Sequence, residues 1–184
     1  MSKKTTLGLF LVLAVVQIAV PASMIAQHEI VLREGRLYKF KTAPVVPADA
    51  FRGRYVALSM AETMGPTDPD VHWETNQRAY AELTEDSQGF AHISRVTPKK
   101  PEGPDYIVVR IRYIEGPQVH VDLPIDRYYM NEYMAPEAEY AYMEHSRATV
   151  DDAYVTVRVL NGHAVIEGLY VADTRIEEFI KKKK

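Results

Sequence analysis

The side chains that could carry out hydrolytic chemistry in this chain are few and scattered. Ser23 could act as a nucleophile only with a general base, because an unassisted hydroxyl reacts poorly. His120 and Asp122 alternate with Val119 and Val121, so they share the polar face of one predicted strand, where a carboxylate could orient an imidazole. An ordinary solvated strand face explains the same spacing. The sequence therefore provides no convincing catalytic site.

Metal-binding residue types show no spacing typical of a site. The six histidines, at positions 28, 72, 92, 120, 145 and 163, include no His-Glu-x-x-His pair. No EF-hand loop surrounds the acidic residues that could hold calcium, and a solvated helix face is the better explanation for them: Glu137, Glu139, Glu144, Asp151 and Asp152. The chain has no cysteine, which excludes disulfides, zinc–thiolate sites and iron–sulfur clusters. We expect no metal and no cofactor.

The composition is that of a folded domain with a balanced charge. Hydrophobic residues make up 47% of the 184 residues, charged residues 26%, and the formal net charge is −3. A chain of this length can form one domain with its own core but is short for two. A slightly acidic balance argues against nucleic acid as a partner.

The N-terminal segment has the composition of a membrane-spanning helix. Its apolar run begins at Leu7 and ends at Ala26, and about 20 helical residues at 1.5 Å each cross a hydrocarbon core of about 30 Å. Lys3 and Lys4 precede the run, so we expect the N-terminus in the cytoplasm and the bulk of the chain outside the cytoplasmic membrane. A cleavable secretory signal is the alternative. We favour an uncleaved anchor, because the best small-residue cleavage site places Pro21 beside the cut.

Beyond the anchor, the periodicity predicts a mainly β (α+β) fold. Residues 1–35 form the anchor and a helical extension that Gly35 ends, and residues 36–184 form one domain outside the membrane. Apolar alternation predicts strands over residues 36–42, 54–60, 77–83, 90–96, 106–114, 119–125, 153–160 and 164–171. Asn161-Gly162 predicts a tight hairpin between the last two strands. Residues 64–70 predict an irregular loop, residues 136–148 an amphipathic helix, and the C-terminus a short helix or extended arm with a basic tail.

Tyrosines are concentrated before and within the predicted helix. Of the twelve in the chain, five fall within residues 127–143: Tyr128, Tyr129, Tyr133, Tyr140 and Tyr142. Amphipathic rings of this kind form contact surfaces between proteins, and they also pack helices against sheets. Both roles are open for this segment.

The run F-R-G-R-Y-V-A-L-S-M at residues 51–60, after an anchor and A-P-V-V-P-A-D, resembles the signature of the GDYXXLXY family of bacterial membrane-anchored proteins. Gly53, Tyr55 and Leu58 match the motif, whereas Arg54 replaces its aspartate and Met60 its final tyrosine. The resemblance implies association with a multi-spanning membrane protein and no defined activity. A role for the aspartate carboxylate, if relatives use one, cannot be filled by Arg54.

Ser23-Met24 at the membrane exit, followed by a strand near Gly53, also resembles signal-peptidase-like serine hydrolases. A lysine is the base in that class, but the strand that would supply it reads H-I-S-R-V, with Ser94 in the lysine's place. The resemblance therefore implies at most a hydrolase with a non-standard site.

We therefore expect an accessory protein that binds or stabilises an integral membrane partner in the bacterial inner membrane. The expected partner contacts are Arg52, Gly53, Arg54, Tyr55, Arg127, Tyr128 and Tyr129. The alternatives are the membrane-anchored hydrolase and a periplasmic ligand sensor, which would need a pocket.

Overall fold

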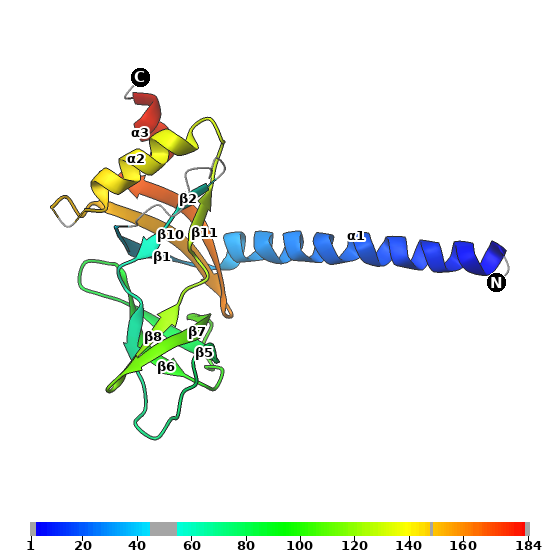
Figure 1. Cartoon of the computed structure of the whole chain (residues 1–184), viewed down its shortest axis with the longest axis horizontal. Coiled ribbons are helices and arrows are strands. Elements are labelled where there is room, and N and C mark those ends of the chain that lie inside the picture. The colour runs from blue at the N-terminus through cyan, green and yellow to red at the C-terminus, as the bar shows by residue number, and fades with distance from the viewer. Residues whose placement is uncertain (1–2, 45–54, 148, 183–184) are drawn as a thin grey trace.

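A long helix, α1 (Lys3–Glu34), projects away from the β-rich part of the chain (Figure 1). The structure is a computed structural model that describes residues 3–44, 55–147 and 149–182. From Leu7 to Glu34 the helix is long and apolar enough to cross a membrane, with a mean hydropathy of 2.4 in its most apolar window. None of that window is buried against the rest of the chain. The helix is therefore not a core element, which is consistent with a single-pass anchor.

The junction between α1 and the first strand is a single residue, Gly35. The Gly35 N–H donates to the Val31 carbonyl at 2.9 Å, and β1 (Arg36–Ala43) begins at the next residue. Val31 is only 2% exposed. The prediction that the anchor helix continues over residues 27–35 and ends at Gly35 is confirmed.

The first five-stranded sheet has the order β12-β11-β10-β1-β3 and includes an eight-pair ladder between β10 and β11. β10 (Ala153–Leu160) pairs antiparallel with β1 on one side and with β11 (His163–Val171) on the other. β12 (Thr174–Arg175) and β3 (Ser59–Met60) lie at the two edges. The predicted hairpin is confirmed, with positive φ at both turn residues, +49° at Asn161 and +89° at Gly162.

Two helices lie together above this sheet, α2 (Ala135–His145) and α3 (Ile176–Lys182) (Figure 1). The predicted helix over residues 136–148 is confirmed, although it ends earlier: the Ser146 N–H caps the Tyr142 carbonyl at 2.8 Å. α2 buries Ala138, Ala141 and Tyr142, in agreement with the predicted apolar stripe. At the C-terminus the structure has the short helix and not the extended arm.

The second five-stranded sheet has the order β4-β8-β7-β5-β6. β5 (Arg78–Glu85) and β6 (Ala91–Thr97) correspond to the strands predicted over residues 77–83 and 90–96 and form a hairpin, and β7 (Tyr106–Glu115) corresponds to the strand predicted over residues 106–114. β8 (Gln118–Asp122) is shorter than the predicted strand over residues 119–125.

The prediction of an irregular loop over residues 64–70 is wrong at its start. Met64–Pro66 forms the edge strand β4, paired antiparallel with β8, and the Val121 N–H donates to the Thr63 carbonyl at 2.8 Å. A proline is tolerated there because an edge strand needs hydrogen bonds on one side only. The prolines of the segment favour a loop, so local sequence patterns did not predict this strand.

The predicted strand over residues 54–60 is also wrong as a single element. From Tyr55 onward it divides into β2 (Tyr55–Ala57), which pairs with β9 (Arg127–Tyr129), and β3, which pairs with β1. At the break, the Leu58 N–H donates to the Asp126 carbonyl at 2.9 Å. Alternate side chains still point into the core, since Val56, Leu58 and Met60 are all buried.

One hydrophobic cluster contains residues from both five-stranded sheets. The tip of the β10–β11 hairpin joins the sheets, because Gly162 forms a bridge with Ile107 of β7. The Val108 N–H donates to the Gly162 carbonyl at 3.0 Å, and the Gly162 N–H donates to the Tyr106 carbonyl at 3.1 Å. The two sheets are thus held together at the end of the domain nearest α1.

Candidate interaction surface

The two-stranded sheet brings together the two segments in which sequence analysis placed partner contacts. Tyr55 lies opposite Tyr129, and Ala57 lies opposite Arg127, in the β2–β9 ladder. The motif segment and the tyrosine-rich segment are about 70 residues apart in the sequence, so only the antiparallel pairing makes them neighbours. Arg52, Gly53 and Arg54 lie outside the described residues.

One face of this ladder is exposed and aromatic. The rings of Tyr55 and Tyr129 are 5.7 Å apart, and the Arg127 guanidinium lies 5.4 Å from the centre of the Tyr55 ring. Tyr129 is 67% exposed, and Tyr133, at the far end of a shallow hollow lined by residues 129–133, is 82% exposed. We call these four residues the aromatic surface. Amphipathic rings and an arginine are enriched at contacts between proteins.

The opposite face of the same ladder is packed against the domain. Tyr128 is only 6% exposed, and its hydroxyl donates to the Glu177 carboxylate at 2.5 Å. Burial, together with the Glu177 carboxylate, raises the pKa of Tyr128. Arg175 lies within 3.5 Å of the same hydroxyl. Tyr128 therefore attaches β9 to α3, and its direct contact with a partner stays a prediction.

Tyr142 has a comparable structural role on the other side of the motif. Its hydroxyl donates to the Ala43 carbonyl at 2.9 Å and accepts from the Ser59 N–H at 3.3 Å. Burial raises the pKa of Tyr142. These bonds connect α2 to β1 and β3, so the helix holds the second half of the motif segment in place. Sequence analysis left this tyrosine open between contact and packing, and the structure shows packing.

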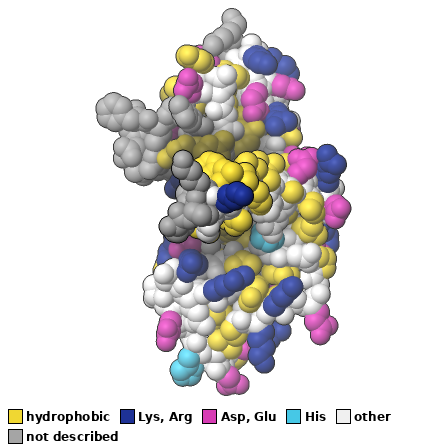
Figure 2. Space-filling view, turned by 90° about the vertical axis from the view of Figure 1, so that its right-hand side faces the viewer, with side chains coloured by type: hydrophobic (Ala, Val, Ile, Leu, Met, Phe, Trp, Pro, Cys, Tyr) yellow, Lys and Arg dark blue, Asp and Glu magenta, His cyan; other side chains and the backbone are white. Residues whose placement is uncertain are grey.

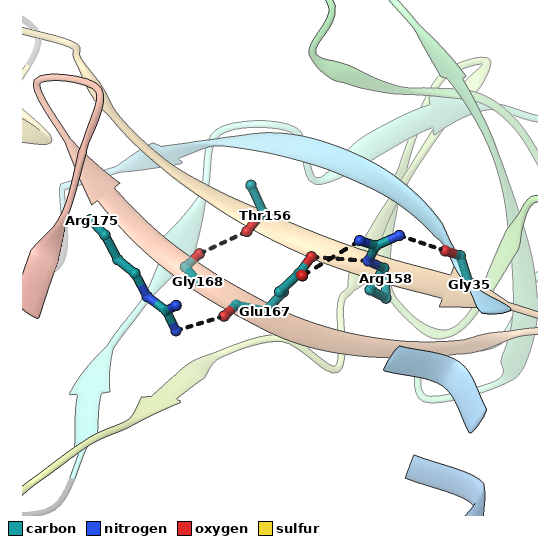
Figure 3. Close-up of polar contacts among 6 residues, drawn as sticks. All are labelled: Gly35, Thr156, Arg158, Glu167, Gly168 and Arg175. Atoms are coloured by element: carbon teal, nitrogen blue, oxygen red, sulfur yellow. Dashed lines mark hydrogen bonds and ion pairs between the residues drawn. The ribbon is translucent and has the colours of Figure 1, made fainter. Parts of the chain in front are cut away.

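A second set of contacts connects the junction after α1 to the first sheet, and sequence analysis missed it. The Arg158 guanidinium forms two hydrogen bonds with the Glu167 carboxylate, at 2.9 and 3.4 Å, and donates to the Gly35 carbonyl at 3.2 Å (Figure 3). Glu167 lies at a β-bulge where the register of β10 and β11 shifts. Its backbone carbonyl accepts from Arg175 at 3.2 Å. A bulge has no reliable signal in local periodicity, so these partners could not be matched from the sequence.

The candidate catalytic residues are not brought together. The Ser23 hydroxyl donates to the Val20 carbonyl at 2.7 Å within α1. His120 instead stacks on Tyr113 with ring centres 4.0 Å apart and contacts the Glu115 carboxylate at 3.0 Å. Asp122 accepts from Arg112 at 2.7 Å, and the Ser94 hydroxyl donates to the Glu82 carbonyl at 3.1 Å. Among the described residues no contact joins Ser23 to a general base, and the proposed His120/Asp122 pair is not formed.

Several of the candidate metal ligands have other contacts. Within the ranges that the structure describes, no group of three or more His, Asp or Glu side chains could hold a metal ion. His145 Nδ1 lies 2.6 Å from the Asp152 carboxylate, and His92 Nδ1 lies 2.9 Å from that of Glu62. These are pairs within the domain and provide no further ligand.

These features define a class: a β-rich domain attached by a single residue to one apolar helix that is long enough to span a membrane. The family model described as "GDYXXLXY protein" matches residues 17–169, which is most of the chain. The protein belongs to the GDYXXLXY family. No curated protein and no solved structure matches the chain. The resemblance predicted from Gly53, Tyr55 and Leu58 is confirmed, although Arg54 and Met60 depart from the motif.

Proposed function

We propose that this protein is an accessory protein of the bacterial cytoplasmic membrane that binds or stabilises an integral membrane partner through the aromatic surface. The domain lies on the outer side of that membrane, and the chain crosses it once, with the N-terminus in the cytoplasm. Lys3 and Lys4 before the apolar run support this orientation, because basic residues are retained on the cytoplasmic side.

The observation that carries the proposal is the short, hydrogen-bonded connection between α1 and the domain. The chain passes from α1 to β1 through Gly35 alone, and Arg158 holds the carbonyl of that residue. A domain on a flexible linker would sample many orientations, whereas the contacts at Gly35 restrict the orientation of this domain relative to the helix. A short tether also raises the effective concentration of the domain toward a membrane partner, to the mM range.

The orientation can be tested with single cysteines, because the chain contains none. In intact spheroplasts, a membrane-impermeant maleimide should modify a Glu102→Cys variant and should modify a Thr5→Cys variant only after the membrane is permeabilised. The mature protein should keep the full mass of 20.9 kDa if the anchor is uncleaved. The reverse labelling pattern would place the domain in the cytoplasm, and a mass lacking the N-terminal segment would establish a cleaved signal.

The partner contact can be tested by photo-crosslinking in cells. With p-benzoylphenylalanine in place of Tyr129 or Tyr133, the full-length protein should form an adduct with an integral membrane protein. The matched control is Tyr113, a tyrosine of β7 that is 47% exposed and lies on the second sheet, away from the aromatic surface. Equal adducts from Tyr113, or none from the two test positions, would overturn the assignment of this surface.

A further inference from the structure

A hollow of about 460 Å³ lies beneath the tip of the β10–β11 hairpin. Its walls come from β5, β7, the hairpin, the segment before β7 and the segment after β8. The polar and aromatic residues that line it are Arg78, Tyr80, Lys100, Tyr106, Asn161 and His163. The aromatic surface shares none of these residues, so this is a separate site.

The position of the hollow relative to a membrane follows from one contact. The Gln27 side-chain nitrogen lies 2.7 Å from His163 Nε2, at the hairpin tip. Gln27 comes directly after Ala26, where the apolar run ends. The headgroup layer on each side of a bilayer is about 5–7 Å thick. The hairpin tip and the hollow beside it therefore lie at the level of the headgroups when α1 spans the bilayer.

The side of the domain from which α1 projects, which would lie next to the membrane, is rich in basic side chains. Figure 2 shows this face, with Lys and Arg side chains gathered below the end of the helix. Within the hollow, Arg78 and Lys100 are both exposed, and in the described parts of the chain neither forms an ion pair with a carboxylate. The Arg78 guanidinium has one aromatic contact, 5.7 Å from the centre of the Tyr80 ring.

Two carboxylates near these cations in the sheet or in the sequence are paired elsewhere. Asp122, opposite Arg110 on the neighbouring strand, accepts from Arg112 at 2.7 Å. Asp105, which precedes Tyr106, contacts Arg36 at 3.0 Å. Because neither Arg78 nor Lys100 forms an ion pair with a carboxylate in the described parts of the chain, their positive charge is available to an anion from outside the chain.

We propose that this hollow binds the phosphate of an anionic phospholipid in the leaflet beside the domain. An arginine fork and a lysine suit phosphate oxygens, while tyrosine rings suit the glycerol at the headgroup level. A lipid is the source, and not free phosphate, because the hollow opens at the depth where lipid headgroups lie. The proposal depends on α1 crossing a membrane and is independent of the partner contact proposed above.

The test is phospholipid binding by the purified full-length protein, measured by native mass spectrometry from mild detergent. Phosphatidylglycerol should bind to the wild type, and phosphatidylcholine, whose phosphate is paired with its own choline, should bind much more weakly. Each basic residue near an anionic lipid surface contributes about fivefold in binding. A double variant, Arg78→Gln with Lys100→Gln, should therefore bind phosphatidylglycerol roughly 25-fold more weakly.

The matched control removes the same charge elsewhere. Lys181→Gln with Lys182→Gln, on exposed positions of α3, should leave binding unchanged. The exchange Arg78→Lys with Lys100→Arg keeps both charges and should retain binding, which separates loss of charge from loss of folding. Wild-type binding by the Gln variant, an equal loss in the α3 control, or displacement of the lipid by equimolar glycerol phosphate would each overturn the proposal.

Discussion

Replacing Gly162 by alanine should lower the free energy of unfolding of the full-length protein by about 2–5 kcal/mol. Two costs add at this position. A non-glycine residue at φ +89° costs about 1–2 kcal/mol. An added Cβ would also lie 2.7 Å from both the Tyr106 and the Val108 side chains, and overpacking of this kind costs about 1–3 kcal/mol.

The measurement is urea unfolding in mild detergent, followed by the fluorescence of the single tryptophan. Trp73 is 8% exposed and belongs to the shared core, so its emission reports on that core. Gly89→Ala is the matched control, since Gly89 has φ +80° but nothing within 4 Å of an added Cβ. The free energy of unfolding of this variant should fall only by the backbone cost of about 1–2 kcal/mol. Equal losses in the two variants would show that the hairpin tip is not tightly packed against β7.

Replacing Gly35 by alanine should weaken the packing between the end of α1 and the domain. An added Cβ would lie 2.4 Å from the Val31 carbonyl oxygen and 3.1 Å from the backbone nitrogen of Val159. Neither atom can move without breaking hydrogen bonds at the end of α1 or at the end of the β1–β10 ladder. We expect a loss of about 1–3 kcal/mol in stability. We also expect faster amide hydrogen exchange between Val31 and Arg36, because local opening there becomes easier.

Gly8→Ala is the control for this experiment, because Gly8 lies in the same helix with nothing within 4 Å of an added Cβ. Its exchange in residues 31–36 should match the wild type. If the proposed function is right, Gly35→Ala should also weaken the crosslink from Tyr129, since the orientation of the aromatic surface would be less restricted. An unchanged exchange rate at the junction would contradict the restricted connection on which the proposed function depends.

Much of the fold could be predicted from local patterns. The apolar run after Lys4 predicts a helix of membrane length, and Gly35 predicts its end. Period-2 alternation in residues such as Val109 and Ile111 predicts β7, because one strand face is buried and the other is solvated. Asn161-Gly162 predicts the hairpin, because few residue pairs accept two positive φ angles.

The candidate sites were less accessible to such reasoning. Tyr55 and Tyr129 were identified as contact residues, but their adjacency depends on the β2–β9 pairing. The break at Leu58 that creates this pairing leaves the apolar alternation intact, so periodicity could not reveal it. Arg78 and Lys100 belong to no recognisable motif. They line one hollow only because the fold brings them together with the hairpin tip.

The sequence by itself determined the apolar helix of membrane-spanning length, the β-rich class, the hairpin and the family, since each depends on residues close together in the chain or on a matching motif. Only the tertiary structure decided which strands share a sheet, that Tyr128 packs inward while Tyr129 is exposed, and that the hairpin tip meets Gln27. These outcomes depend on pairings between distant segments, and the free energy of such pairings comes from the packing of the whole domain.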